Sequence, residues 1–181
     1  MHYDKLQDTN INATADFWVG DPCYVVPDEC WSALCDNWQA YDKKHQDDED
    51  FKHHYVAQVE DEPTGLCFHL WSTAYGDGSY PLFVNDNKVA SLGVDAGTLS
   101  VIPMTLIEHW NKTGQIGNYE QMGHVVKAAH LQGELICEEG DFTWGALSLP
   151  TGGMDEGWSD EEQEDEWGEG DRECVDFGFM R

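Results

Sequence analysis

Basic residues are scarce in this sequence. Its 181 residues include only nine Lys and Arg against 36 Asp and Glu, which gives a formal net charge of −27. A protein that neutralises nucleic-acid phosphates needs clustered basic side chains. We therefore expect no direct binding to nucleic acid, and by the same argument no binding to an anionic membrane surface. By charge, the partners that suit this chain are cations or basic protein surfaces.

Long apolar runs are also lacking. No stretch approaches the roughly 18 consecutive apolar residues that a membrane-spanning helix needs. The first residues do not combine a basic start with an apolar stretch, so we expect no signal peptide. Without such a signal we interpret the six cysteines as reduced thiols, most of them buried. The predicted location is the cytoplasm.

Closely spaced metal ligands are missing from the sequence as well. Zinc sites favour pairs such as Cys-x2-Cys, whereas Cys30 and Cys35 would lie on different sides of a helix. The histidines carry no local signature of a catalytic pair. We therefore assign no catalytic residue, no metal ligand and no cofactor. A pocket near Cys23, His69 and Asp77 is the alternative that would make the protein an enzyme or a metal protein.

The residues that are present predict a folded, β-rich domain. Hydrophobic residues make up 40% of the chain and include eight tryptophans. Short apolar runs broken by Gly, Asn and Asp predict an antiparallel meander between residues 65 and 104. The expected fold class is α+β: an antiparallel sheet or small barrel with one N-terminal helix and an acidic C-terminal tail. The expected domains are a flexible N-terminus at 1–15, one globular domain at 16–150 and the tail at 151–181.

One helix is predicted near the N-terminus. Pro27 suits a first helical turn, and the acidic side chains of Asp28 and Glu29 favour the positive end of the helix dipole. An apolar stripe at helical spacing follows, and it consists of Trp31, Leu34, Cys35 and Trp38. The charged stretch after it, residues 42–54, is expected to be a surface loop.

Gly76-Asp77-Gly78 is the most motif-like short stretch. It lacks the Lys-Ser/Thr of a P-loop and the spaced oxygen ligands of an EF-hand loop. Asp-Gly tolerates the positive φ of a two-residue hairpin turn. We therefore interpret it as a hairpin turn that sets the register of the sheet, with Tyr75 and Tyr80 as a cross-strand pair.

Carboxylates are concentrated near the C-terminus. Residues 155–171 hold ten of them and no basic residue, with Trp158 and Trp167 between them. Such a run repels itself, and spaced aromatics make it a candidate docking element for a basic groove. The alternative is a tail that only keeps the protein soluble. The predicted partner-binding residues are Asp155, Glu156, Trp158, Asp160, Glu161, Glu162, Glu164, Asp165, Glu166, Trp167, Glu169 and Asp171, together with Asp47, Asp48, Glu49 and Asp50.

Three stretches carry a resemblance to a group of known sequences. They are VGDPCYVVPDECWSALCDNW, STAYGDGSY and LGVDAGTLSVIP, between Phe17 and Met104. In this order they resemble small uncharacterised proteins of tailed bacteriophages and some bacteria. The resemblance implies a phage-type viral protein that acts in the cytoplasm of a bacterial host, and it brings no catalytic residues. The acidic C-terminal residues are not part of the pattern.

Charge and resemblance together lead to a hypothesis about function. Duplex DNA carries one negative charge per roughly 1.7 Å of its axis, and a protein face with similar carboxylate density can occupy a DNA-binding groove. We expect a non-enzymatic acidic protein that blocks the basic surface of a host nucleic-acid-binding or defence protein, as a DNA mimic. An acidic protein kept soluble by its charge, a virion structural or assembly protein, and the enzyme or metal protein described above are the alternatives.

Overall fold

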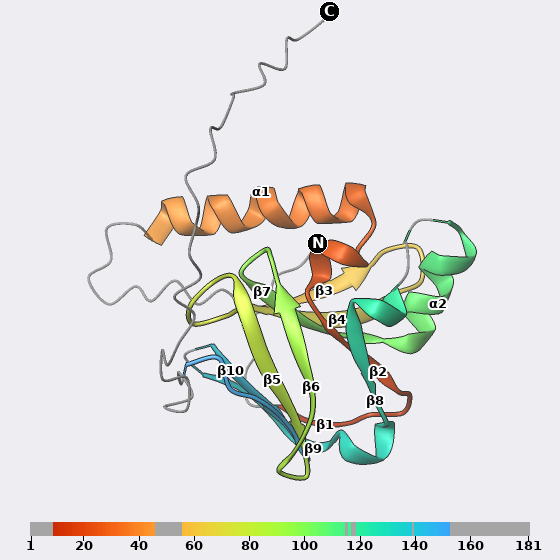
Figure 1. Cartoon of the computed structure of the whole chain (residues 1–181). Helices are drawn as coiled ribbons and strands as arrows, with labels where there is room; N and C mark the ends of the chain where they lie inside the picture. The colour runs from red at the N-terminus through yellow and green to blue at the C-terminus, as the bar shows by residue number, and fades with distance from the viewer. Residues whose placement is uncertain (1–8, 46–55, 115, 117–118, 139, 153–181) are drawn as a thin grey trace, which may run out of the picture.

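Two antiparallel β-sheets and two α-helices form the part of the chain that the computed structural model describes, residues 9–45, 56–114, 116, 119–138 and 140–152 (Figure 1). This is the expected β-rich α+β class. The elements are β1 (Thr9–Asn12), β2 (Phe17–Gly20), η1 (Pro22–Tyr24), α1 (Asp28–His45), β3 (Val56–Asp61), β4 (Leu66–Ser72), β5 (Gly78–Val84), β6 (Asn87–Val94), β7 (Thr98–Pro103), α2 (Met104–Lys112), η2 (Tyr119–Gln121), β8 (Gly123–Val126), η3 (Ala128–His130), β9 (Gln132–Glu138), β10 (Asp141–Trp144) and β11 (Leu147–Leu149).

The strands divide between the sheets in an order that differs from a meander. Sheet A has the order β1-β9-β10-β11-β5-β6, and sheet B has the order β3-β4-β7-β2-β8. Strands β4 and β7 pair with each other in sheet B, while the β5–β6 hairpin between them in sequence belongs to sheet A. The expected meander is therefore wrong, because the connections on either side of β5 and β6 cross from one sheet to the other.

The connection at Gly76-Asp77-Gly78 is one of these crossings. It joins β4 of sheet B to β5 of sheet A, and these two strands are not hydrogen-bonded neighbours. The hairpin expected here, with Tyr75 and Tyr80 as a cross-strand pair, is therefore wrong. A two-residue hairpin turn is found instead between β5 and β6, where Asn85 and Asp86 have φ angles of 49° and 60°. Positive φ at both central residues suits the right-handed twist of paired strands.

Sheet B is buried on both faces. Val19, Trp71 and Val101 point toward sheet A, where they pack with Leu82 and Phe142. Successive residues of a strand point to opposite faces. The other face of sheet B carries Trp18, Phe68, Leu70 and Ile102, which pack against both α-helices. The molecule therefore has three layers, with sheet B between sheet A and the helices (Figure 1).

Helix α1 contains the predicted apolar stripe. Leu34 is buried, and Trp31 and Trp38 are half-buried against the helix side of sheet B. The helix continues to His45, so the surface loop expected from residue 42 is wrong for residues 42–45, and residues 46–54 lie outside the described residues. No described helix combines the length and the apolar composition needed to cross a membrane.

Residues close to the ends of the described chain also belong to the sheet structure. Strand β1 lies within the N-terminal segment 1–15 and pairs with β9 at one edge of sheet A. At the other end, Thr151 follows β11, is 1% exposed, and bonds to neighbouring loops. Its hydroxyl donates to the carbonyl of Gly140 over 2.6 Å.

Candidate functional site

Four loops that are far apart in sequence meet at one end of the sheets. They are residues 21–24, 73–78, 95–97, and the pair of segments 140–141 and 151–152, and we call them together the loop end. In Figure 1 the loop end lies where β6 ends and β5 begins, on the side of α1. The first three loops contain the Gly-Asp-Pro-Cys-Tyr, Gly-Asp-Gly and Val-Asp-x-Gly motifs of the sequence.

Asp21 joins two of these loops through its buried carboxylate. One oxygen accepts the N–H of Cys23 over 2.9 Å, which starts η1. The other oxygen accepts the N–H groups of Asp95 and Ala96 over 2.7 and 2.9 Å. Asp21 is 0% exposed, and a buried carboxylate is tolerated when N–H donors surround it. Asp21 therefore has a structural role in the loop end.

The Gly-Asp-Gly stretch packs directly on the Val-Asp-x-Gly turn. The hydroxyls of Thr73 and Tyr80 both donate to the carbonyl of Gly76, over 2.6 and 2.8 Å. The N–H of Thr73 donates to the carbonyl of Gly97 over 2.9 Å. A Cβ on Gly97 would lie 3.4 Å from the Cα of Gly76, and both glycines have positive φ. The two glycines therefore allow the turns to approach each other.

A second set of contacts holds the segment that leaves the last strand. The N–H groups of Thr151 and Gly152 both donate to the carboxylate of Asp141 over 2.6 Å. The N–H of Ala74 donates to the hydroxyl of Thr151, and the hydroxyl of Tyr75 donates to the carbonyl of Gly152. The chain therefore leaves the described residues at the loop end, beside Tyr75.

The outer surface of the loop end is acidic and carries an exposed aromatic ring. Asp77 and Asp95 are exposed, and neither forms an ion pair with a described residue. Tyr75 is 60% exposed. The hydroxyl of Tyr24 donates to the carboxylate of Asp95, and this hydrogen bond is the main reason that the pKa of Tyr24 rises to about 12. The loop end thus presents negative charge that no described cation neutralises.

The thiol of Cys23 lies among these carboxylates. Burial, the hydrogen bond to Asp21 and the charges of Asp21, Asp95 and Asp77 together raise its pKa to about 12. A nucleophilic cysteine needs the thiolate form at neutral pH. Cys23 is a neutral thiol there, which does not favour a role as a nucleophile.

His69, the third residue of the pocket expected for an enzyme or metal protein, lies in a strand. The structure brings Cys23 and Asp77 together, but His69 belongs to β4, where it is 7% exposed. Burial lowers the pKa of His69 to about 4, so its imidazole is neutral at pH 7. Among the described residues, no group of three or more His, Cys, Asp or Glu side chains is arranged to hold a metal ion.

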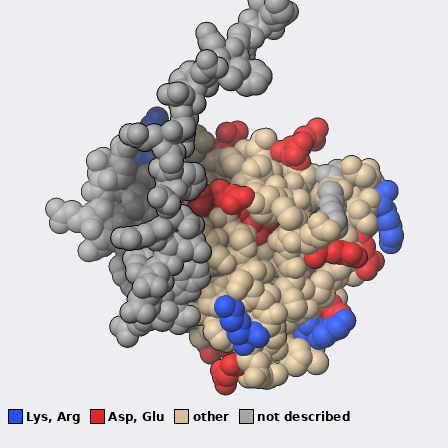
Figure 2. Space-filling model, in the orientation of Figure 1, with Lys and Arg blue, Asp and Glu red and all other residues tan. Residues whose placement is uncertain are grey.

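The residues predicted to bind a partner lie outside the described part of the chain. This applies to the set between 155 and 171 and to Asp47, Asp48, Glu49 and Asp50. The described residues are themselves acidic, since they contain 17 Asp and Glu and five Lys, a formal charge of −12 out of −27 for the chain. Figure 2 shows these charges in small separate groups on one face, with neutral surface between them.

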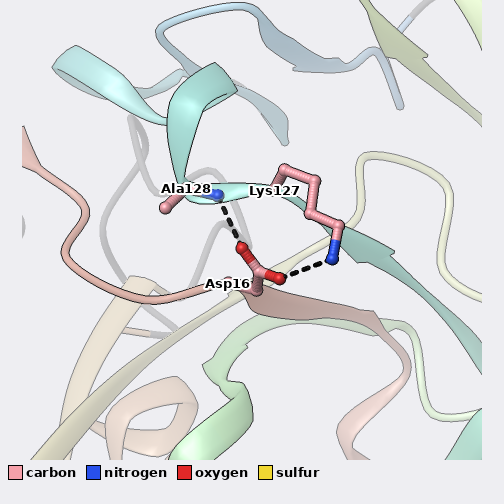
Figure 3. A network of polar contacts seen from close by, with 3 residues as sticks. All are labelled: Asp16, Lys127 and Ala128. Atoms are coloured by element: carbon pink, nitrogen blue, oxygen red, sulfur yellow. Dashed lines mark hydrogen bonds and ion pairs between the residues drawn. The ribbon is translucent and has the colours of Figure 1, made fainter.

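The opposite end of the sheets holds its charges differently. Asp16 precedes β2, and its carboxylate lies 2.7 Å from the ammonium of Lys127 and accepts the N–H of Ala128 (Figure 3). The hydrogen bond from Lys127 is the main reason that the pKa of Asp16 is lowered, followed by the bond from Ala128.

Comparisons of the chain with protein-family models, curated proteins and solved structures find no match.

Sequence reasoning singled out the three motifs of the loop end but treated each one separately. It also missed the roles of Asp21, Asp141 and Thr151. A signal was available, because the motifs follow β2, β4 and β6, and each of them comes directly after a predicted strand. Which strand ends share one edge depends on the pairing, which the sequence pattern did not give.

Proposed function

We propose that this protein binds and blocks a basic, nucleic-acid-binding surface of another protein. The observation that carries the proposal is the loop end, where Asp77 and Asp95 are exposed without a cationic partner among the described residues. These charges belong to a chain of net charge −27. Surface charge of one sign attracts partners of the opposite sign and speeds their association.

The exposed ring of Tyr75 gives this surface an anchor. Tyrosine is enriched among the residues that contribute most to protein–protein binding, because its ring is large and its hydroxyl is polar. A tyrosine ring also attracts the guanidinium or ammonium groups of a basic partner. The contacts around Ala74 and Gly76 hold the loop before binding, which reduces the entropy that binding must overcome.

The carboxylates between residues 155 and 171 add to the same surface in this proposal. Their segment begins after Gly152, which is bonded to the loop end. The resemblance to proteins of tailed bacteriophages supports a host nucleic-acid-binding or defence protein as the partner, met inside the bacterial cell. Because the core carboxylates in Figure 2 stand in separate groups, mimicry of DNA rests on the loop end and the acidic segment.

Affinity capture with the full chain tests this proposal. The immobilised protein should retain a nucleic-acid-binding protein from bacterial lysate, and added duplex DNA should displace it. Retention should weaken by roughly tenfold or more between about 50 mM and about 500 mM salt, because salt screens exposed charges. Capture that neither salt nor duplex DNA affects would contradict the proposal.

Matched variants separate the loop end from the total charge. Asp77→Asn with Asp95→Asn removes two carboxylates from the loop end, whereas Asp86→Asn with Glu134→Gln removes two exposed carboxylates from other parts of sheet A. Both double variants have the same net charge. We expect the first pair, and also Tyr75→Ala, to weaken capture more than the second pair does. Equal effects would mean that the total charge and not the loop end attracts the partner.

A further inference from the structure

His69 is buried on the face of sheet B that packs against sheet A. Its strand, β4, lies between β3 and β7, and His69 is opposite Gln58 on one side and Val101 on the other. Trp71, two residues further along, points to the same face. The Trp71 ring stacks on Phe142 of sheet A, with ring centroids 4.1 Å apart and planes 11° apart. His69 is therefore next to an aromatic stack that joins sheet B to sheet A.

The imidazole of His69 has little to neutralise a positive charge. Its Nδ1 atom is buried and has no hydrogen-bond partner among the described residues. Adding a proton there would create a buried N–H without an acceptor, together with a buried charge. When the ring is neutral and Nδ1 carries no proton, neither the unpaired N–H nor the buried charge is present.

The titratable groups on the same face are few. The strand register places Glu60 and Cys67 on this face of sheet B, one pair away from Gln58 and His69, and His124 in the same row on β8. Glu60 is exposed at the edge strand. The apolar side chains that sheet A contributes to this core include Tyr80 and Cys137, and the charge of Asp141 in β10 acts on Cys137. Burial raises the pKa of Cys137 to about 12, so it stays uncharged.

We propose that His69 makes the packing of the two sheets acid-sensitive, so that protonation of its imidazole separates Trp71 from Phe142. The neutral ring fits the interface at pH 7 and the charged ring does not. Because β4 runs directly into residues 73–78, this separation also loosens the loop end and releases what is bound there. The first part of the inference does not depend on the proposed function.

The pH range follows from the two states of the histidine. In the unfolded chain His69 takes up its proton near pH 6.5, whereas burial lowers the pKa of the folded imidazole to about 4. The contribution of neutral His69 to stability is therefore complete above about pH 6.5 and is lost as the pH falls toward about 4. Between pH 7 and pH 4 the unfolding equilibrium constant should rise by up to about tenfold per pH unit, roughly a hundredfold in total.

Urea unfolding of the full chain at several pH values between 7 and 4 tests the inference. Wild-type protein and His69→Gln share all carboxylates, so the difference between them isolates the histidine. We expect the variant to lose the tenfold-per-unit dependence. His124→Gln, from the same row but half-buried, is the control and should keep it. Equal pH dependence of wild type and His69→Gln would overturn the inference.

A second measurement applies even when His69→Gln does not fold. Histidine resonances of labelled wild-type protein can be followed by NMR as the pH is lowered, together with the near-ultraviolet circular dichroism of the aromatic core. We expect the His69 resonance to titrate far below pH 6.5, with loss of the aromatic signal over the same range. Titration near pH 6.5 with the aromatic signal intact would overturn the inference.

Discussion

An aspartate lies at each end of strand β2, and the two carboxylates have different partners. At the loop end, Asp21 is fully buried, and its carboxylate accepts N–H groups from two different loops. At the other end, Asp16 is partly exposed and forms an ion pair with Lys127. Among the described residues, the loop end is thus held together by N–H and hydroxyl donors and not by cations. No described cation neutralises the exposed carboxylates of Asp77 and Asp95.

Removing the carboxylate of Asp21 should have the largest effect on stability. Asp21→Ala leaves the N–H groups of Cys23, Asp95 and Ala96 without their acceptor, so the free energy of unfolding should fall by about 2 to 4 kcal/mol. Urea unfolding measures this loss. In the matched control, Asp16→Ala, the loss should be clearly smaller, because only the N–H of Ala128 loses its acceptor and a partly exposed ion pair contributes little to stability. A loss of the same size in both variants would contradict the distinction between the two ends.

A change in β8, opposite the last residue of β2, sharpens the comparison by testing the strand that precedes Asp21. Gly20 and Gly123 are paired across β2 and β8. A Cβ on Gly123 would lie 2.4 Å from the Trp18 ring and 2.5 Å from the carbonyl oxygen of Val19. Gly123→Ala should therefore lower the free energy of unfolding by about 1 to 3 kcal/mol.

Gly93 supplies the control for that substitution. It lies in β6, and a Cβ there would have nothing within 4 Å. Thermal unfolding of Gly93→Ala should match that of wild type closely. If Gly123→Ala were equally well tolerated, the Trp18 ring would not restrict the size of the side chain at position 123.

The smallest expected effect concerns the charges of the loop end. Burial, the bond to Asp21 and the charges of Asp95 and Asp77 raise the pKa of Cys23 to about 12. In Asp77→Asn one of these charges is removed, so the pKa of Cys23 should fall by less than about one unit. Alkylation of Cys23 at about pH 8.5, followed by mass spectrometry, should become up to severalfold faster.

A carboxylate at the other end of sheet A provides the comparison for this measurement. Asp86 is exposed in the β5–β6 turn, and Asp86→Asn should leave the alkylation rate of Cys23 unchanged. In wild-type protein Cys23 should react far more slowly than a free cysteine. A wild-type rate equal to that of free cysteine would mean that neither burial nor the carboxylates control this thiol.

Local patterns predicted the local structure well. The spacing of Trp31, Leu34 and Trp38 predicted α1, because the side of a helix that is buried depends on residues a few positions apart. The β-rich class also followed from short apolar runs. The prediction of a meander was wrong because a connection of the length of residues 73–77 can lead either to a neighbouring strand or to another sheet. Periodicity describes which face of a strand is apolar, and it does not identify the strand that pairs with it.

The candidate site depends on this missing information. The aspartates at positions 21, 77 and 95 each follow a strand, and the sequence predicts a turn at each of them. That these turns share one end is a consequence of strand pairing over long sequence separations, such as β4 with β7. The acidic segments predicted to bind a partner lie outside the described residues, so their role remains a prediction.

The bonds from Thr151 and Gly152 to the loop end have a kinetic consequence. They fix the last described residues, Thr151 and Gly152, beside Asp141 and Tyr75. If, as proposed, a basic partner contacts both the loop end and the acidic segment, release of one contact leaves it held near by the other, so that it rebinds before it diffuses away. Two individually weak contacts can in this way give a long residence time. Inserting residues directly after Gly152 would shorten that residence time, because a longer linker lowers the effective concentration.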